Sequence, residues 1–330
     1  MPGGCIAADV HGKADLASRS FGHHVRHLHL IGPDGRVQKL SAETRKAAFR
    51  ATIGGMGQTG AIASARIALR PAPSQMVEVE ERRMPDLDAL LDAYSASLST
   101  FSVAWIDATA RGRAVGRGIL EEADFTDGPA PTRRGLRLRV PIDAPRGALA
   151  GPVVRGFNRL WYARVPEGGR TRLRAIGAFL HPLDGIADWN RLYGARGFHQ
   201  VQVVVPEAGA AEALHAMLGA IGESGLAAPL AVLKRLGGEG AGLLSFPMAG
   251  WTLAVDLVNR PGVGALAQRL AEQAGTAGGR LYLAKDALAG PGDIAAMYPA
   301  LPAFHAALEK LDPEGWFATD LARRTGLRAA

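Results

Sequence analysis

Amide and lysine side chains interrupt strands that are otherwise apolar in the second half of the sequence. Gln200 and Gln202 alternate with valines in one expected strand, Lys234 follows Leu233 in another, and Lys285 ends a third. Because successive side chains point to opposite faces of a strand, Gln200 and Gln202 lie opposite the valines and Lys234 opposite Leu233, whereas Lys285 shares a face with Leu281 and Leu283. Buried polar groups need hydrogen-bond partners. The pattern favours a half-polar cavity wall, although exposure at a sheet edge would explain any one of these residues.

Glycine, aspartate and histidine residues near the N-terminus form a second candidate set. Gly3 and Gly4 could let the backbone approach a ligand and offer amides to phosphate groups, with a simple turn as the alternative. Asp9 and His11 stand two apart on a segment that we expect to be extended, so both would face one ligand. The single cysteine, Cys5, excludes an internal disulfide and a multi-cysteine metal site, and we predict no metal.

The charge balance limits the classes of partner. Lys and Arg number 38 against 31 Asp and Glu, a formal net charge of +7, which suits nucleic acid, an anionic membrane surface or a phosphorylated substrate. No zinc-finger, homeodomain or RNP-like pattern accompanies the charge, so we expect no nucleic-acid partner. The excess positive charge could bind a phosphate-bearing lipid substrate, or it could simply belong to a solvated surface. Without a signal peptide or an apolar run of about 18 residues, we expect a cytoplasmic chain, with peripheral membrane association left open.

The expected strands and helices must position these residues. Strands are expected at 25–31, 36–40, 62–69, 76–81, 101–107, 172–180, 199–205, 230–236, 251–257 and 280–285, and helices at 85–98, 208–224, 263–275 and in the tail from 293. Residues 199–285 then follow the order β-α-β-β-α-β, the ferredoxin-like arrangement, with both helices on one face of the sheet. Residues 110–160 have weak periodicity and are expected to be loops, and no internal repeat is evident.

Several strings in this order resemble one family. They are Gly3–Lys13, Ser20–Val25, the glycine loop Thr52–Gly60, Ser102–Asp107, His181–Asp184, Trp189–Gly194, Gln200–Gln202, Leu244–Pro247, Gly250–Trp251, Gly279–Asp286 and Asp320–Arg324. The succession is similar to FAD-linked oxidases of the vanillyl-alcohol oxidase/PCMH superfamily, and within it to the decaprenylphosphoryl-ribose oxidase family. The resemblance covers essentially all 330 residues and is least clear at 110–160.

The resemblance implies an α+β fold with two domains. A split FAD-binding domain of the PCMH type would comprise residues 1–74 and 280–330, and a substrate domain with a ferredoxin-like antiparallel sheet covered by helices would comprise 75–279. The first FAD segment of the family has no counterpart here, so the FAD domain is expected to be incomplete at its N-terminus. A mis-assigned start, a separate polypeptide that completes the domain and a repurposed protein are the alternatives.

The resemblance also assigns roles to single residues. It implies non-covalent FAD and oxidation of a sugar hydroxyl, the 2'-hydroxyl of a polyprenyl-phospho-ribose, to a ketone by hydride transfer. Lys285 and His11 would be catalytic. The residues expected to bind the cofactor are Gly3, Gly4, Ala8, Asp9, His11, Gly12, Ile62 and Tyr282. Those expected to bind substrate are Lys13, Trp105, Tyr193, Gln200, Gln202 and Lys234.

Other functions stay open at this point. The ketone would be the midpoint of an epimerisation to arabinose, so an NADH-dependent reductase is an expected partner. An aldonolactone or alditol oxidase of the same superfamily, acting on a free sugar, is one alternative. A non-catalytic remnant or partner protein without a complete FAD site is another. Ala254 stands where family members that covalent nitroaromatic inhibitors capture have a cysteine, so we expect no such capture here.

Overall fold

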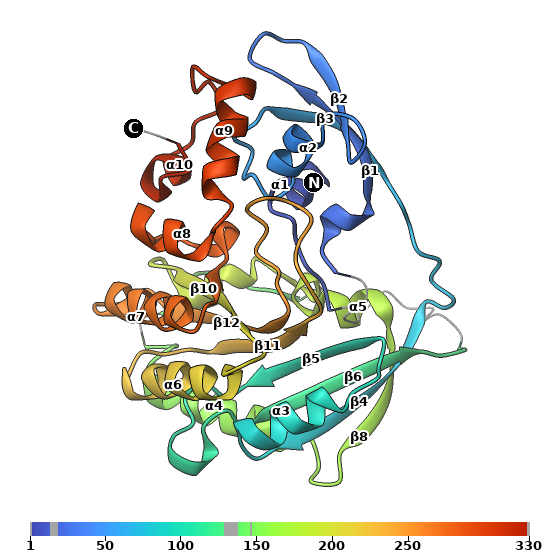
Figure 1. Ribbon diagram of the computed structural model, residues 1–330. Coiled ribbons are helices and arrows are strands. Elements are labelled where there is room, and N and C mark those ends of the chain that lie inside the picture. The colour runs from blue at the N-terminus through green and yellow to red at the C-terminus, as the bar shows by residue number, and fades with distance from the viewer. Residues whose placement is uncertain (1, 14–18, 129–137, 146, 329–330) are drawn as a thin grey trace.

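An eight-stranded antiparallel sheet forms the larger part of the structure (Figure 1). The computed structural model describes residues 2–13, 19–128, 138–145 and 147–328. In spatial order the strands of this sheet are β13 (Arg280–Leu281), β10 (Phe198–Pro206), β12 (Gly250–Val258), β11 (Leu230–Leu236), β5 (Phe101–Ile106), β6 (Gly118–Phe125), β4 (Met76–Met84) and β8 (Arg170–Ala175). With the helices around it, the chain has the mixed helix and sheet composition that the sequence predicts.

Two copies of one topology make up this sheet. β10, α6 (Ala210–Glu223), β11, β12, α7 (Val263–Thr276) and β13 pair in the order β13-β10-β12-β11, which confirms the expected β-α-β-β-α-β arrangement. β4, α3 (Leu87–Ser95), β5, β6, α4 (Gly151–Ala163) and β8 pair in the same relative order, and the copies meet at β5 and β11. The two copies share a pairing order rather than a residue pattern, so the sequence itself shows no repeat.

Three helices cover one face of the large sheet. α3, α6 and α7 pack on side chains such as Val203, Leu233 and Leu253, all at most 2% exposed, in one continuous core. Asp86 begins α3 by accepting a hydrogen bond from the Ala89 amide at 2.9 Å, the usual role of an N-cap aspartate. Each fully buried aliphatic side chain of this kind contributes about 1.5–3 kcal/mol. Within the part of the chain that the structure describes, no helix has the length and apolar character needed to cross a membrane.

The two ends of the chain lie side by side above the sheet (Figure 1). The N-terminal part contributes the small sheet β2-β1-β3 (Val37–Ser41, Val25–Ile31 and Ala61–Ile67) with α1 (Pro2–Ala7) and α2 (Lys46–Thr52). The C-terminal part contributes α8 (Pro291–Met297), α9 (Leu301–Leu311) and α10 (Asp320–Thr325). Arg328 joins the two parts by donating to the carbonyl of Gln58 and, at 2.5 Å, to the carboxylate of Asp312. The domain boundaries at 74 and 280 stay a prediction.

Four expectations about local structure are wrong. Gly3 and Gly4 lie in the helix α1 rather than in a turn, and the region 110–160, expected to be loops, contains β6 and α4. β6 escapes the pattern because Glu121 and Glu122 lie within it, and α4 because Gly151, Pro152 and Gly156 lower its apparent helix propensity. The strand expected at 172–180 ends at Ala175, and the helix α5 (Ile176–Leu180) follows it. The strand expected at 280–285 ends at Leu281, and a 3-10 turn, η6 (Leu283–Lys285), follows.

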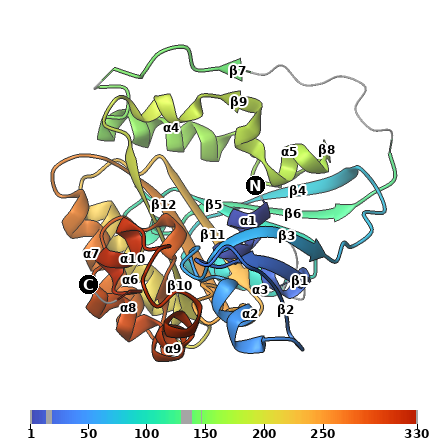
Figure 2. The same ribbon diagram turned by 90° about the horizontal axis from the view of Figure 1, so that it is seen from above.

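Helix α4 lies across the ends of the strands, apart from α3, α6 and α7 (Figure 2). Its anchor is Asp107, which follows β5 and is 1% exposed. The carboxylate accepts from the Arg117 guanidinium at 2.9 and 2.5 Å and from the Asn158 side-chain amide of α4 at 2.9 Å. A buried charge needs such partners, because an isolated carboxylate would not stay ionised away from water. Asp107 therefore fixes α4 to the sheet.

Replacing Asp107 by alanine should lower the free energy of unfolding by about 3–5 kcal/mol, because Arg117 would lose its buried counterion. Urea unfolding followed by circular dichroism measures the change. Asp88→Ala is a matched control, since its exposed carboxylate pairs with His215 on the surface and its loss should cost less than about 1 kcal/mol. Equal losses in the two variants would contradict the anchoring role of Asp107.

Candidate functional site

The face of the large sheet opposite α3, α6 and α7 carries the polar side chains that the sequence singles out. Valines of β10 at 201, 203 and 205 lie in the helix-covered core, so Gln200 and Gln202 point to the other face. Strand register places further residues on this polar face, which we define by Trp105, Gln200, Gln202, Lys234, Thr252 and Asp256. Ala254 lies between Gln202 and Val232 on the same face. The separation of faces predicted from the period of two is confirmed.

His11 reaches the polar face from the segment that follows α1. Its Nε2 accepts a hydrogen bond from the Gln202 amide at 2.8 Å, and the same amide donates to the Thr252 hydroxyl at 3.0 Å. This leaves the ring proton on Nδ1, which is buried and has no hydrogen-bond partner among the described residues. Burial, followed by the charge of Lys234, lowers the pKa of His11 to about 3. The imidazole is therefore neutral at physiological pH.

Two stacked aromatic rings lie beside His11. The rings of Phe246 and Tyr282 stack at 4.6 Å, and their centroids lie 5.7 and 5.8 Å from that of His11. The Tyr282 hydroxyl donates to the carbonyl of Ala8 at 3.2 Å, and burial raises its pKa. Phe246 and Tyr282 are buried in one small core cluster, so three segments distant in sequence meet around these rings.

Two lysines, one on the polar face and one beside it, have ammonium groups without a partner among the described residues. Lys234 projects from β11, and Lys285 projects from η6 rather than from the end of a strand as expected. Burial, then the charges of Lys13 and Lys285, lower the pKa of Lys234 to about 8, and burial also lowers the pKa of Lys285. Within the described part of the chain neither ammonium makes a hydrogen bond or a salt bridge. Two desolvated amines thus keep free donors for a ligand.

Asp256 is a site residue that the sequence analysis missed. It is 1% exposed, and its carboxylate accepts from the Tyr193 hydroxyl at 2.6 Å and the Gln200 amide at 2.5 Å. Burial raises its pKa, while these two donors and Lys285 oppose the shift. The signal was present in the sequence, because Asp256 is the charged residue in the apolar strand β12 and stands two and four positions after Ala254 and Thr252. Tyr193 and Gln200 are thereby held in place rather than free.

Lys13 and Trp105 lie toward the other half of the sheet. The Lys13 ammonium donates to the carbonyl of Phe179 at 2.7 Å and sits 4.9 Å from its ring centroid, and burial lowers its pKa. Trp105 is half-buried on β5, directly opposite Val232. Beyond them Glu81 accepts from Arg164 at 2.7 Å and also pairs with Arg170, so that end of the face is an internal ion-pair cluster.

The residues expected to bind a cofactor fall into two groups. Gly3 and Gly4 lie in α1, and a side chain at Gly3 would come within 4.0 Å of Ile62 on β3. Asp9 and His11 do not face one ligand together, because Asp9 turns the backbone with φ of 41° and is fully buried. Its carboxylate accepts from the amides of Gly22 and Ala241 at 2.7 and 2.9 Å and from the Ser245 hydroxyl at 2.5 Å. Asp9 therefore supports the segment that carries His11.

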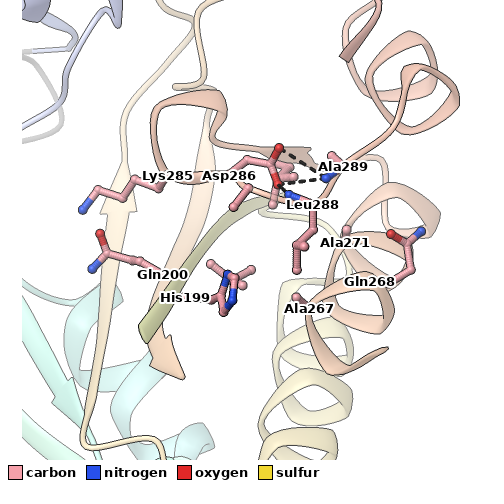
Figure 3. A pocket seen from close by; sticks show the side chains of 12 residues that line it. His199, Gln200, Ala267, Gln268, Ala271, Lys285, Asp286, Leu288 and Ala289 are labelled. Carbon is pink, nitrogen blue, oxygen red and sulfur yellow. Dashed lines mark hydrogen bonds between the residues drawn. The ribbon is translucent and has the colours of Figure 1, made fainter. Parts of the chain in front are cut away.

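Two crevices open onto this region. The first lies between β10, α7 and the turn after β13 and is lined in part by His199, Gln200, Gln268, Lys285, Asp286 and Leu288. In Figure 3, Lys285 and Gln200 point to one side of β10, whereas His199 points toward α7. The second crevice is lined by His11, Gly12, Arg19, Arg235, Leu236, Gly237, Gly238 and Pro247. The structure thus brings His11, Gln200, Gln202, Lys234, Tyr282 and Lys285 to one region.

Two known proteins are similar to this sequence over most of its length. The chain is 34% identical over 339 residues to decaprenylphosphoryl-β-D-ribose oxidase of Mycolicibacterium smegmatis, with 98% of the chain and 73% of that protein covered. It is 33% identical over 345 residues to an uncharacterized protein in the mprA 5' region of Streptomyces coelicolor, with 98% and 92% covered. No protein-family model matches. The chain is an oxidoreductase of the FAD-linked oxidase class, and it belongs to the decaprenylphosphoryl-β-D-ribose oxidase family.

Replacing Tyr193 by phenylalanine should lower the free energy of unfolding by about 1.5–3 kcal/mol, because buried Asp256 would lose a donor to its charge. Chemical unfolding measures the loss. Tyr162→Phe is the matched control, since the Tyr162 hydroxyl donates to the neutral carbonyl of Met84 at 3.4 Å and its removal should cost less than about 1 kcal/mol. A loss at Tyr193 no larger than that at Tyr162 would refute this role.

Proposed function

We propose that this protein oxidises the 2'-hydroxyl of a polyprenyl-phospho-ribose to a ketone with non-covalently bound FAD. The observation that carries the proposal is the pair of desolvated lysines, Lys234 and Lys285, which have no partner among the described residues and flank neutral His11 at the polar face. The printed name of the Mycolicibacterium relative supplies the substrate class. FAD, when bound, accepts the hydride that leaves the carbinol carbon.

The residues present fit a flavin. The buried Nδ1 of His11 lacks a partner among the described residues, as a group awaiting a ligand would. The buried, stacked pair Tyr282 and Phe246 would support the segment that carries His11, and Lys285, a cation once it holds the substrate proton, would favour negative charge on a neighbouring ring system. The segment Ala8–Gly12, with Gly3, Gly4 and Ile62, would hold the cofactor together with Tyr282. Since the Asp9 carboxylate already has three donors, its contribution would come from the backbone.

The chain's own residues would orient the sugar and move its proton. Oxidation of a secondary alcohol removes a hydride from carbon and a proton from oxygen. Lys285, whose pKa burial lowers, would hold the reacting hydroxyl and accept that proton in its neutral form. Lys234 would meet the anionic phosphate, and Trp105 would pack on the sugar or prenyl portion. The hydrogen-bonded groups Gln200, Gln202 and Tyr193 would fix the position of the ring.

The keto-sugar would be passed to a second enzyme. Reduction from the opposite side of the ring would give the arabinose epimer, which calls for an NADH-dependent reductase as partner. No group on the polar face is assigned to that half-reaction. Turnover to the epimer should therefore require that the reductase be added.

Lys285→Ala should lower kcat with polyprenyl-phospho-ribose and a dye acceptor by about 10²–10⁴-fold, because the proton acceptor is lost. Lys310→Ala on the outside of α9 is the matched control and should leave turnover unchanged. Both proteins should release yellow FAD into the supernatant on acid precipitation, which shows that the cofactor is bound and dissociable. Full turnover by Lys285→Ala would refute its role, and turnover of free aldonolactones alone would refute the substrate.

The KM for the phosphorylated substrate should rise about tenfold between pH 7 and 9. Lys234, with a pKa of about 8, is protonated below that pH and neutral above it, so its attraction for phosphate fades as pH rises. Lys234→Arg should remove this rise, because the guanidinium stays charged throughout the range. Steady-state kinetics across the pH range provide the measurement. An identical rise in both proteins would assign the pH dependence to another group.

A further inference from the structure

The outer surface of α4 carries exposed apolar and arginine side chains that have no role in the proposed reaction. Successive residues of a helix are about 100° apart, so the 13 residues of α4 divide into stripes. Val154, Asn158 and Tyr162 recur every four residues and face the body of the protein, where Asn158 donates to Asp107. Most of the other residues of α4 are exposed.

An apolar stripe occupies part of that outer surface. Val153, Phe157, Leu160 and Trp161 are 52%, 50%, 74% and 38% exposed, and the rings of Phe157 and Trp161 stack at 5.8 Å. Scattered single apolar residues on a surface are common, but four large ones on one stripe of one helix mark an interaction site. We call these four residues the apolar stripe.

Two arginines lie on the opposite flank of this outer surface from the apolar stripe. Arg155 and Arg159, with Arg111 and Arg117 from the connection between β5 and β6, line one pocket. Arg117 is neutralised by Asp107, and Arg111 donates to the carbonyl of Gly222. Arg155 and Arg159 are exposed and have no acceptor among the described residues, and the described lining of the pocket contains no acidic side chain. Guanidinium groups in this state suit phosphate, which they bind through two parallel hydrogen bonds.

We propose that α4 docks the protein on the surface of a bilayer that contains anionic phospholipid. The apolar stripe would enter the boundary between headgroups and acyl chains, and Arg155 and Arg159 would bind headgroup phosphates. Interfacial helices combine Trp, Phe and Leu on one side with Arg on the other. A protein partner would also cover the apolar stripe, but two arginines on the same helix that have no acceptor among the described residues favour a surface rich in phosphate. The net charge of +7 acts in the same direction.

The docking helix borders the candidate site. Val154 on its inner side packs with Ala227, Val258 and the ring of Tyr193, and the Tyr193 hydroxyl donates to Asp256 on the polar face. If the substrate is lipid-linked, as the proposed function holds, its sugar would reach this face while its prenyl chain stays in the membrane. Docking itself does not depend on that substrate, so it can be tested without it.

Flotation of the purified chain with vesicles tests docking. Vesicles of phosphatidylcholine alone are compared with an equimolar mixture of phosphatidylcholine and phosphatidylglycerol. The double variant Arg155→Gln/Arg159→Gln should bind the anionic vesicles about 30-fold more weakly, since each arginine near such a surface contributes a factor of about five. The double variant Phe157→Ser/Leu160→Ser should bind at least about tenfold more weakly. Arg36→Gln and Trp316→Ser, exposed residues elsewhere, are the matched controls and should bind like the wild type.

Flotation and oligomeric state together distinguish docking on a membrane from self-association. Binding that is lost in both α4 variants, retained in both controls and weakened by salt, with unchanged melting temperatures, supports the proposal. Binding that the α4 variants retain would overturn it. So would a wild-type chain that does not float but forms a dimer abolished by Phe157→Ser/Leu160→Ser, because the stripe would then belong to a second copy. Since the vesicles contain no sugar lipid, neither result depends on the proposed reaction.

Discussion

The carboxylate of Asp9 sets the geometry on which the candidate site depends. A fully buried charge beside a backbone of positive φ is costly in two ways, and such a conformation persists only where the surroundings hold it. Two backbone amides and the Ser245 hydroxyl supply that support. Gly22 belongs to the N-terminal part, whereas Ala241 and Ser245 lie in the loop before β12. Asp9 therefore fixes the N-terminal segment to that loop. His11, two residues later, is thereby brought against Gln202.

The polar face obeys the rule that also governs Asp9: each buried polar group must find a hydrogen-bond partner or be able to bind a ligand. Gln202 uses both amide hydrogens, and Asp256 has two donors. Nδ1 of His11 and the ammonium groups of Lys234 and Lys285 remain without partners among the described residues. The division is chemically sensible: the groups that are paired position the site, and those that are unpaired can act on a substrate.

Sequence patterns predicted the parts of this arrangement that depend on local periodicity. The alternation in β10 separated Val203 from Gln202, and the order of elements from 199 onward was enough for the β-α-β-β-α-β topology. What the patterns could not give depends on partners distant along the chain. Asp107 and Asn158 are 51 residues apart, and Asp9 and Ser245 are 236 apart. A local cause explains the missed helix: the glycines and arginines of α4 conceal its helical period, so the segment was expected to be a loop.

The central proposal is that the polar face holds the sugar while a hydride passes from its C2' to bound FAD. The most direct measurement mixes the FAD-loaded chain, without oxygen, with polyprenyl-phospho-ribose and with the same compound deuterated at C2', and follows the flavin absorbance. We predict bleaching of the flavin band by both compounds, several-fold more slowly with deuterium, because the C2'–H bond breaks in that step. Persistent flavin colour, or bleaching at one rate with both compounds, would contradict it.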